Sequence, residues 1–164
     1  MNLRPATPAD IPAIRTIAQL PQHALLITDE DDAGLLAYLN DPSARLFMLE
    51  TDTDPAAGFA LFCELDSRAG VVELRRLALR EVGRGQGRAF VQLLTDHAFE
   101  SFAAQRVWLD TNFDNTRAQK VYAAVGYQLE GKLRAHGYCA PLGRALDQWI
   151  YGILRHEWQA LREG

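Results

Sequence analysis

Residues 71–79 read VVELRRLAL, and residues 80–89 read REVGRGQGRA. The first run is typical of a strand, and the second carries three glycines in a tight turn between Gly83 and Gly87. From Arg88 to about residue 102, apolar residues recur at helical spacing, which predicts a helix directly after the turn. Glycines let a backbone approach a ligand closely, and the free N–H groups of a helix's first turn favour an anion. Arg84 and Arg88 add forked donors, so the stretch predicts a phosphate-binding turn.

Two common phosphate-binding motifs do not fit this turn. A dinucleotide-binding fingerprint requires a third glycine where this chain has Arg88, and a Walker loop requires a Gly-Lys-Ser/Thr sequence that is absent. A glycine-rich turn that binds no ligand stays open as the alternative.

The rest of the chain predicts strands that alternate with helices. The helix after residue 88 is expected to be a crossover, so the strand that follows it should run parallel to residues 71–79. We therefore expect a mixed α+β fold, with helices on both faces of one sheet. The expected strands are 2–6, Arg45–Glu50, Gly58–Leu65, Val71–Leu79, Arg106–Asp110, Tyr127–Leu133 and Ala145–Leu154, with a loop at Arg134–Gly143 and further helices to about Gln19, over Asp31–Leu39 and before Gly126.

Length and composition narrow the class of protein. A chain of 164 residues with 48% hydrophobic residues predicts a single domain over 1–164. A net charge of −4 disfavours nucleic-acid binding, which normally needs a basic surface. No apolar run is long enough to cross a bilayer, and no signal-peptide layout begins the chain. Two distant cysteines indicate neither disulfides nor a metal cluster, so we expect a cytoplasmic protein without metal.

Three motifs resemble the GNAT superfamily of N-acetyltransferases. RGQGRA, at residues 84–89, resembles the superfamily's pyrophosphate motif, Gln/Arg-x-x-Gly-x-Gly/Ala. About 25 residues later, Asn115-x-x-Ala118-x-x-x-Tyr122 resembles its second signature, and the opening LRPATPAD at 3–10 resembles a typical start. The resemblance spans nearly the whole chain and implies a mostly antiparallel seven-stranded sheet in which one parallel pair of strands splays apart.

The resemblance also implies acetyl-CoA as co-substrate. The backbone of the glycine turn would hold the pyrophosphate, and the pantetheine arm would pair with the end of the preceding strand. Leu77 N–H would donate to the thioester carbonyl. The implied cofactor-binding residues are Leu77, Ala78, Leu79, Arg84, Gly85, Gln86, Gly87, Arg88, Ala89 and Asn115.

Two residues are candidates for proton transfer. Tyr122 stands where related enzymes place the acid that protonates the leaving thiolate, although its position on an apolar helix face is also that of a core tyrosine. Glu73 is a candidate base, because its even spacing from Leu77 predicts that both face the same side of the strand. An exposed, ion-paired glutamate, a base at His136, or a bound water are the alternatives. A covalent route through Cys139 ranks lower, because no histidine stands at a recognisable spacing.

The expected acceptor is a primary amine of a small molecule or a peptide N-terminus. The tail is similar to the branch that contains ribosomal-protein N-terminal and polyamine acetyltransferases. An acidic cluster at Asp29–Asp32, with Glu64 or Asp147, would form a rim that attracts a cationic amine, and a solvated surface is the simpler interpretation of the cluster. A catalytically inactive acyl-CoA sensor, another acyl chain and a homodimer stay open.

Overall fold

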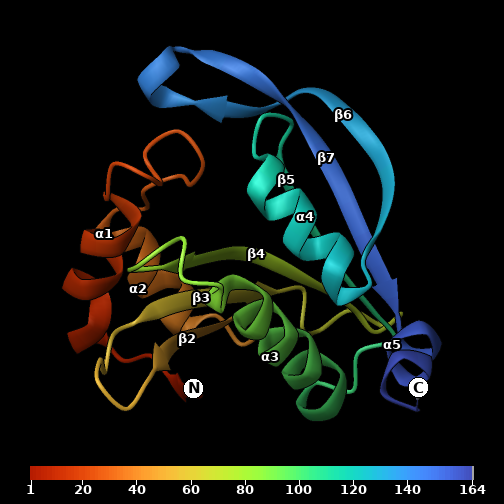
Figure 1. Ribbon diagram of the computed structural model, residues 1–164. Coiled ribbons are helices and arrows are strands. Elements are labelled where there is room, and N and C mark those ends of the chain that lie inside the picture. The colour runs from red at the N-terminus through yellow and green to blue at the C-terminus, as the bar shows by residue number, and fades with distance from the viewer. Residues whose placement is uncertain (164) are drawn as a thin grey trace.

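The computed structural model describes residues 1–163, which build one seven-stranded sheet (Figure 1). The strands follow the order β1-β2-β3-β4-β5-β7-β6. Neighbours pair antiparallel except β4 and β5, which are parallel, so the predicted topology is confirmed. The strands are β1 (Asn2–Pro5), β2 (Arg45–Glu50), β3 (Gly58–Cys63), β4 (Val71–Leu79), β5 (Arg106–Asn112), β6 (Gln128–Cys139) and β7 (Arg144–Leu154).

Two hydrophobic cores lie on opposite faces of the sheet and give the fold its layers. Apolar stripes on α1 and α2 cover one face, where they pack on Leu46, Met48 and Leu61. Stripes on α3 and α4 cover the other face and pack on Leu74 and Val107. None of the helices within residues 1–163 combines the length and apolar character needed to span a membrane. The helices are α1 (Ile11–Ala18), α2 (Asp32–Asn40), α3 (Gln86–Ser101), α4 (Thr116–Val125) and α5 (Arg155–Glu163).

The parallel pair separates soon after it begins. β4 and β5 pair only over Val71–Glu73 and Arg106–Trp108. Beyond these residues the two strands diverge, although each stays paired with its antiparallel neighbour on the other side. The resemblance implied this splayed pair, and the resulting wedge lies between the glycine turn and α4.

An irregularity in β4 reverses which side of the strand its residues face. Phe62 on β3 pairs with Leu74, but Leu61 pairs with Arg76, so Arg75 is an extra residue in a β-bulge. Glu73 therefore lies opposite Cys63, on the face covered by α1 and α2, whereas residue 77 packs against the α3 core. The expectation that Glu73 and Leu77 face the same side is wrong, because the bulge shifts the alternation by one residue.

Three element boundaries also differ from the prediction. The stretch expected as a loop at Arg134–Gly143 is largely strand, since β6 continues to Cys139 before a short 3-10 turn. β6 is an edge strand that pairs only with β7, and shifts in register at 129/131 and 133/137 leave residues 130 and 134–136 outside the pairing. Helix α3 begins at Gln86, two residues earlier than expected, because Gly85 forms its N-cap. The terminal helix α5 was not predicted.

Candidate active site

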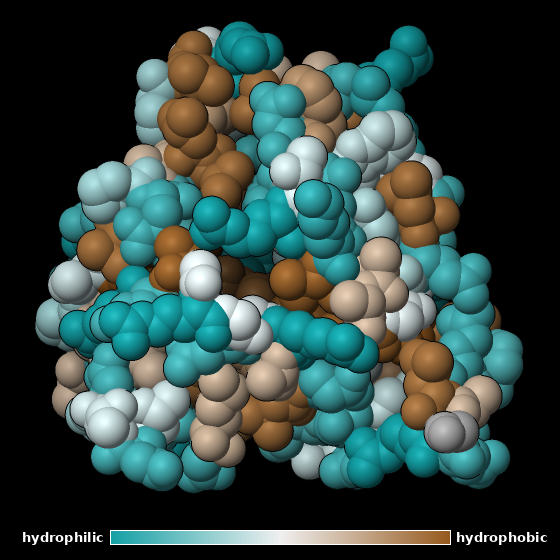
Figure 2. Space-filling model, in the orientation of Figure 1, coloured by the Kyte–Doolittle hydropathy of each residue, from teal (hydrophilic) through white to brown (hydrophobic). Residues whose placement is uncertain are grey.

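A cleft of about 230 Å³ occupies the wedge between β4 and β5. Figure 2 shows it as a hollow with apolar surface inside and hydrophilic side chains around it. Its walls come from β4, the start of α3, β5, α4 and the segment between α1 and α2. Six of the residues proposed for cofactor binding or catalysis lie in these walls: Leu77, Ala78, Leu79, Gly87, Asn115 and Tyr122.

The glycine turn leaves its backbone open to a ligand. Gly83 and Gly85 have φ angles of 87° and 75°, in the left-handed region that glycine adopts without strain. A Cβ atom at either position would meet no protein atom within 4 Å, so conformation and not packing requires glycine there. The first-turn N–H groups of α3 follow at once and have no intrahelical acceptor. A pyrophosphate fits this arrangement, since backbone donors and the helix dipole both favour an anion.

The arginines of the turn lie at the surface beside this site. Arg84 has a side chain that is 71% exposed and pairs with Glu81 at 2.8 Å, and Arg88 is also exposed. Such side chains can turn toward a bound phosphate at little energetic cost, because a surface ion pair contributes little stability.

The edge of β4 presents backbone groups to the cleft. The N–H of Arg80 donates to Ala57 O at 2.8 Å, so residues 78 and 80 point their backbone groups toward β3. By alternation, Leu77 and Leu79 point theirs into the wedge. His23 confirms this direction, because its Nε2 donates to Leu79 O at 2.8 Å.

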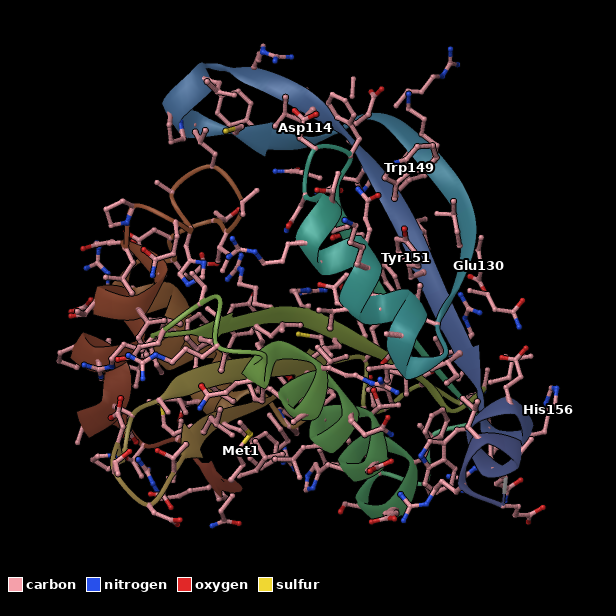
Figure 3. The ribbon with its side chains drawn as sticks, viewed as in Figure 1. Met1, Asp114, Glu130, Trp149, Tyr151 and His156 are labelled. Atoms are coloured by element: carbon pink, nitrogen blue, oxygen red, sulfur yellow. The ribbon has the colours of Figure 1, made fainter. Side chains whose placement is uncertain are left out.

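Tyr122 lies on α4 at the wall of the cleft and is only 6% exposed. Burial raises the pKa of its hydroxyl well above the ordinary value, which keeps the phenol protonated, as a proton donor must be. The ring of Tyr151 lies 5.6 Å away, between β7 and α4 (Figure 3). The nearby Tyr127 serves packing instead, because its hydroxyl is bonded to Thr95 Oγ1 at 2.9 Å in the core.

Asp110 on β5 also lines the cleft, and sequence reasoning missed it. Burial raises the pKa of its carboxyl, and the neighbouring charge of Glu73 raises it further. A raised pKa makes a carboxylate a stronger base. The sequence offered one signal: Asp110 alternates along β5 with the buried Val107 and Leu109, which places its carboxylate on the opposite face of the strand.

Glu73 lies near this carboxylate and is held in an ion pair. It is buried, and its Oε2 accepts from Arg75 Nε at 2.8 Å. The side chain does not line the cleft formed by the described residues, and its influence on Asp110 is through charge. His136 is also close enough to Asp110 for its charge to lower the pKa of that carboxyl.

The segment joining α1 to α2 closes one side of the cleft. His23 holds it to β4, and Asn112 Nδ2 on β5 donates to Leu25 O at 2.8 Å. Neither residue had supporting context in the sequence, because their partners are more than 50 residues away. Asn115, also in the wall, caps α4 by accepting from Ala118 N at 3.2 Å.

The acidic cluster is not a free rim, which corrects that expectation. Arg15 pairs with Asp29 at 3.2 Å and with Asp32 at 2.8 Å. Arg76 pairs with Glu30 at 2.5 Å, and Asp31 Oδ1 caps α2 by accepting from the N–H of residue 34 at 2.7 Å.

The two other expected rim residues are also bound by neighbours. Glu64 Oε2 accepts from Trp108 Nε1 at 3.0 Å, and Asp147 pairs with Lys132 at 2.7 Å. Each carboxylate proposed for the rim therefore has a partner from its own protein.

Comparisons with known proteins agree with this geometry. A sequence profile of the Acetyltransferase (GNAT) family matches residues 11–127. An uncharacterized N-acetyltransferase of Mycobacterium tuberculosis (strain ATCC 25618 / H37Rv) is 32% identical over 126 residues, which cover 73% of this chain and 79% of that protein. The uncharacterized N-acetyltransferase p20 of Bacillus licheniformis is 28% identical over 138 residues, which cover 80% of this chain and 76% of that protein.

A solved structure with the same fold comes from Vibrio cholerae. It is a spermidine N-acetyltransferase in complex with CoA and spermine, with a TM-score of 0.84 and 19% sequence identity. The match covers 96% of this chain and 97% of that one. At this identity the likeness is one of fold.

Proposed function

The chain belongs to the GNAT family and is an acetyl-CoA-dependent N-acetyltransferase, and on that premise we propose that it acetylates a primary amine of a small molecule or peptide N-terminus directly, within a ternary complex. The observation that supports this most strongly is the wedge between β4 and β5. It joins the glycine turn to a cleft lined by both the Tyr122 phenol and the Asp110 carboxylate.

The proposed cofactor contacts follow the shape of the wedge. The backbone from Arg84 to Ala89 would hold the pyrophosphate of CoA at the start of α3. Backbone groups of Leu77 and Leu79 would pair with the pantetheine arm, and Leu77 N–H would stabilise charge on the thioester oxygen. A bound CoA derivative supplies the acyl thioester; the protein supplies position and proton transfer.

The proposed proton transfers use Asp110 and Tyr122. Asp110 accepts the proton that the amine nitrogen loses as it bonds to the carbonyl carbon of the thioester. The carbon–sulfur bond then breaks, and Tyr122 donates its proton to the departing thiolate. Glu73, which was the base candidate from sequence, would act on this step by raising the pKa of Asp110.

The first test is calorimetric titration with acetyl-CoA, combined with thiol release on a panel of amines. Gly87 lines the cleft, so a glutamate there places bulk and negative charge where the pyrophosphate would bind. We expect Gly87→Glu to abolish binding, while Gly131→Glu, at an open position on β6, binds normally. Binding by the wild type without turnover of any amine would favour the catalytically inactive sensor. Normal binding by Gly87→Glu would refute the assigned phosphate site.

A further inference from the structure

A second cavity adjoins the cofactor cleft. Its volume is about 570 Å³, within the range typical of small-molecule sites. It lies between the α1–α2 segment and the tip of the β6–β7 hairpin, which extends toward that segment in Figure 1. The two cavities share five wall residues: Leu26, Ile27, Thr28, Asn112 and Gln148. The two cavities therefore lie side by side, and a molecule in the second is next to the first.

The wall of this second cavity is largely apolar. Leu25, Leu26 and Ile27 line it from the α1–α2 segment, and Tyr138 and Pro141 line it from the hairpin. Figure 2 shows apolar side chains running from the hairpin tip down toward the segment. Apolar walls of this kind favour a ligand with an apolar body, because burying apolar surface is the main source of its affinity.

The cavity offers little negative charge to a polycation. Asp29 is the one carboxylate in its wall among the described residues. Its Oδ2 already accepts from Gln19 Nε2 at 2.8 Å and lies 3.2 Å from a guanidinium nitrogen of Arg15. A ligand with several ammonium groups would lose hydration on entering without meeting free carboxylates in return.

One buried polar atom at the junction of the two cavities lacks a partner. Oε1 of Gln148 is inaccessible to solvent and accepts no hydrogen bond from the described residues. Leaving such an acceptor unpaired is costly. The Gln148 side chain as a whole is half-buried and lines both cavities, so a turn of its amide can present this oxygen to a ligand N–H. Gly137 on β6 provides the room for this amide, because a Cβ there would overlap the Gln148 side chain.

We infer that the acceptor is a small monoamine with an apolar or aromatic body, and that Gln148 receives its amino group. This inference rests on the proposed function and names the substrate class of the same site. The apolar body lies between the α1–α2 segment and the hairpin tip, and the amine N–H donates to Gln148 Oε1 beside Asp110 and Tyr122. Gln148 is thus a specificity-determining residue.

The first experiment compares three amines at saturating acetyl-CoA: 2-phenylethylamine, spermidine and a short peptide with a free N-terminal alanine. We expect kcat/KM for 2-phenylethylamine to exceed both others by about tenfold or more, since one phenyl group buried in an apolar site gives at least that factor. Spermidine or the peptide as the equal or better substrate would overturn the inference and leave the proposed function intact. Turnover of no amine, with acetyl-CoA still bound, would overturn both.

The second experiment tests Gln148 itself. Gln148→Leu should raise KM for 2-phenylethylamine about tenfold, because the hydrogen bond from the amine nitrogen is lost. Gln148→Glu keeps an acceptor oxygen and should restore KM to the wild-type value or below. Gln105→Leu makes the same chemical change at an exposed position and serves as the control. Equal effects of Leu and Glu at position 148, or no effect of either, would overturn the assigned role.

A third variant acts on Gln148 without replacing it. Gly137 has no left-handed φ, so Gly137→Ala displaces the neighbouring amide without straining the backbone. It should raise KM for the amine in the same way as Gln148→Leu. Gly131→Ala, on the same strand with open space around the added carbon, should leave KM unchanged. Calorimetry with acetyl-CoA checks in each variant that the cofactor cleft is intact, and an unchanged KM for Gly137→Ala would contradict the assignment.

Discussion

Deleting the hydroxyl of Tyr122 separates its chemical role from its packing role. Tyr122→Phe keeps the ring, which is buried and lies 5.6 Å from the ring of Tyr151 and 6.1 Å from that of Tyr127. The free energy of unfolding should therefore change by less than about 1 kcal/mol. Loss of a general acid typically lowers the rate by a factor of about 10² to 10⁴, so we expect kcat to fall at least a hundredfold.

The same substitution at Tyr127 is the matched control. Thr95 Oγ1 donates to Val91 O at 2.8 Å and is bonded to the Tyr127 hydroxyl at 2.9 Å, so Tyr127 is the donor in that contact. Tyr127→Phe leaves a buried acceptor without its donor, which costs about 1 kcal/mol. In a domain of this size that lowers Tm by about 2–4 °C, while kcat should stay near the wild-type value.

Two assays distinguish the variants. Thermal unfolding measures stability, and thiol release at saturating acetyl-CoA and amine measures kcat. A kcat for Tyr122→Phe within threefold of the wild type would refute the proton-donor role. Equal losses of kcat in the two variants would show that the ring cluster acts through packing alone.

The remaining predictions concern ionisable groups. Asp110→Asn should lower kcat at least a hundredfold near neutral pH. Glu73→Gln should mainly move the acidic limb of the kcat/KM–pH profile to lower pH, because removing the Glu73 charge lowers the pKa of Asp110. A larger loss of kcat for Glu73→Gln than for Asp110→Asn would restore Glu73 as the base. His97 packs against three phenylalanine rings, and its Nε2 is buried and unpaired among the described residues. Burial lowers the pKa of this imidazole, so the folded state resists its protonation. The free energy of unfolding should therefore fall as the pH drops below about 6.5. His97→Leu should lose less stability than the wild type between pH 7 and pH 5 in chemical denaturation, the exposed His156→Leu should behave like the wild type, and an unchanged pH dependence in His97→Leu would contradict this origin.

The sequence identified some residues of the candidate site and missed others. The two groups differ in how far away in the sequence the residues lie that reveal their roles. Leu77, Gly87, Asn115 and Tyr122 belong to short stretches with a recognisable pattern, and all four lie in the cleft wall. His23, Asn112 and Gln148 acquire their roles from partners or neighbours that are distant in sequence, and no local pattern marks them.

The sequence by itself determined the order of the elements before α5, the glycine turn, the crossover helix and the family. These features depend on spacing within short windows, where helical and strand periodicity and glycine conformation act locally. Tertiary structure alone decided which face Glu73 occupies, because a single bulged residue at Arg75 reverses the alternation and depends on pairing with β3. It also decided how the acidic cluster at Asp29–Asp32 is paired, since Arg15 and Arg76 bind carboxylates that are separated from them by 14 or more positions.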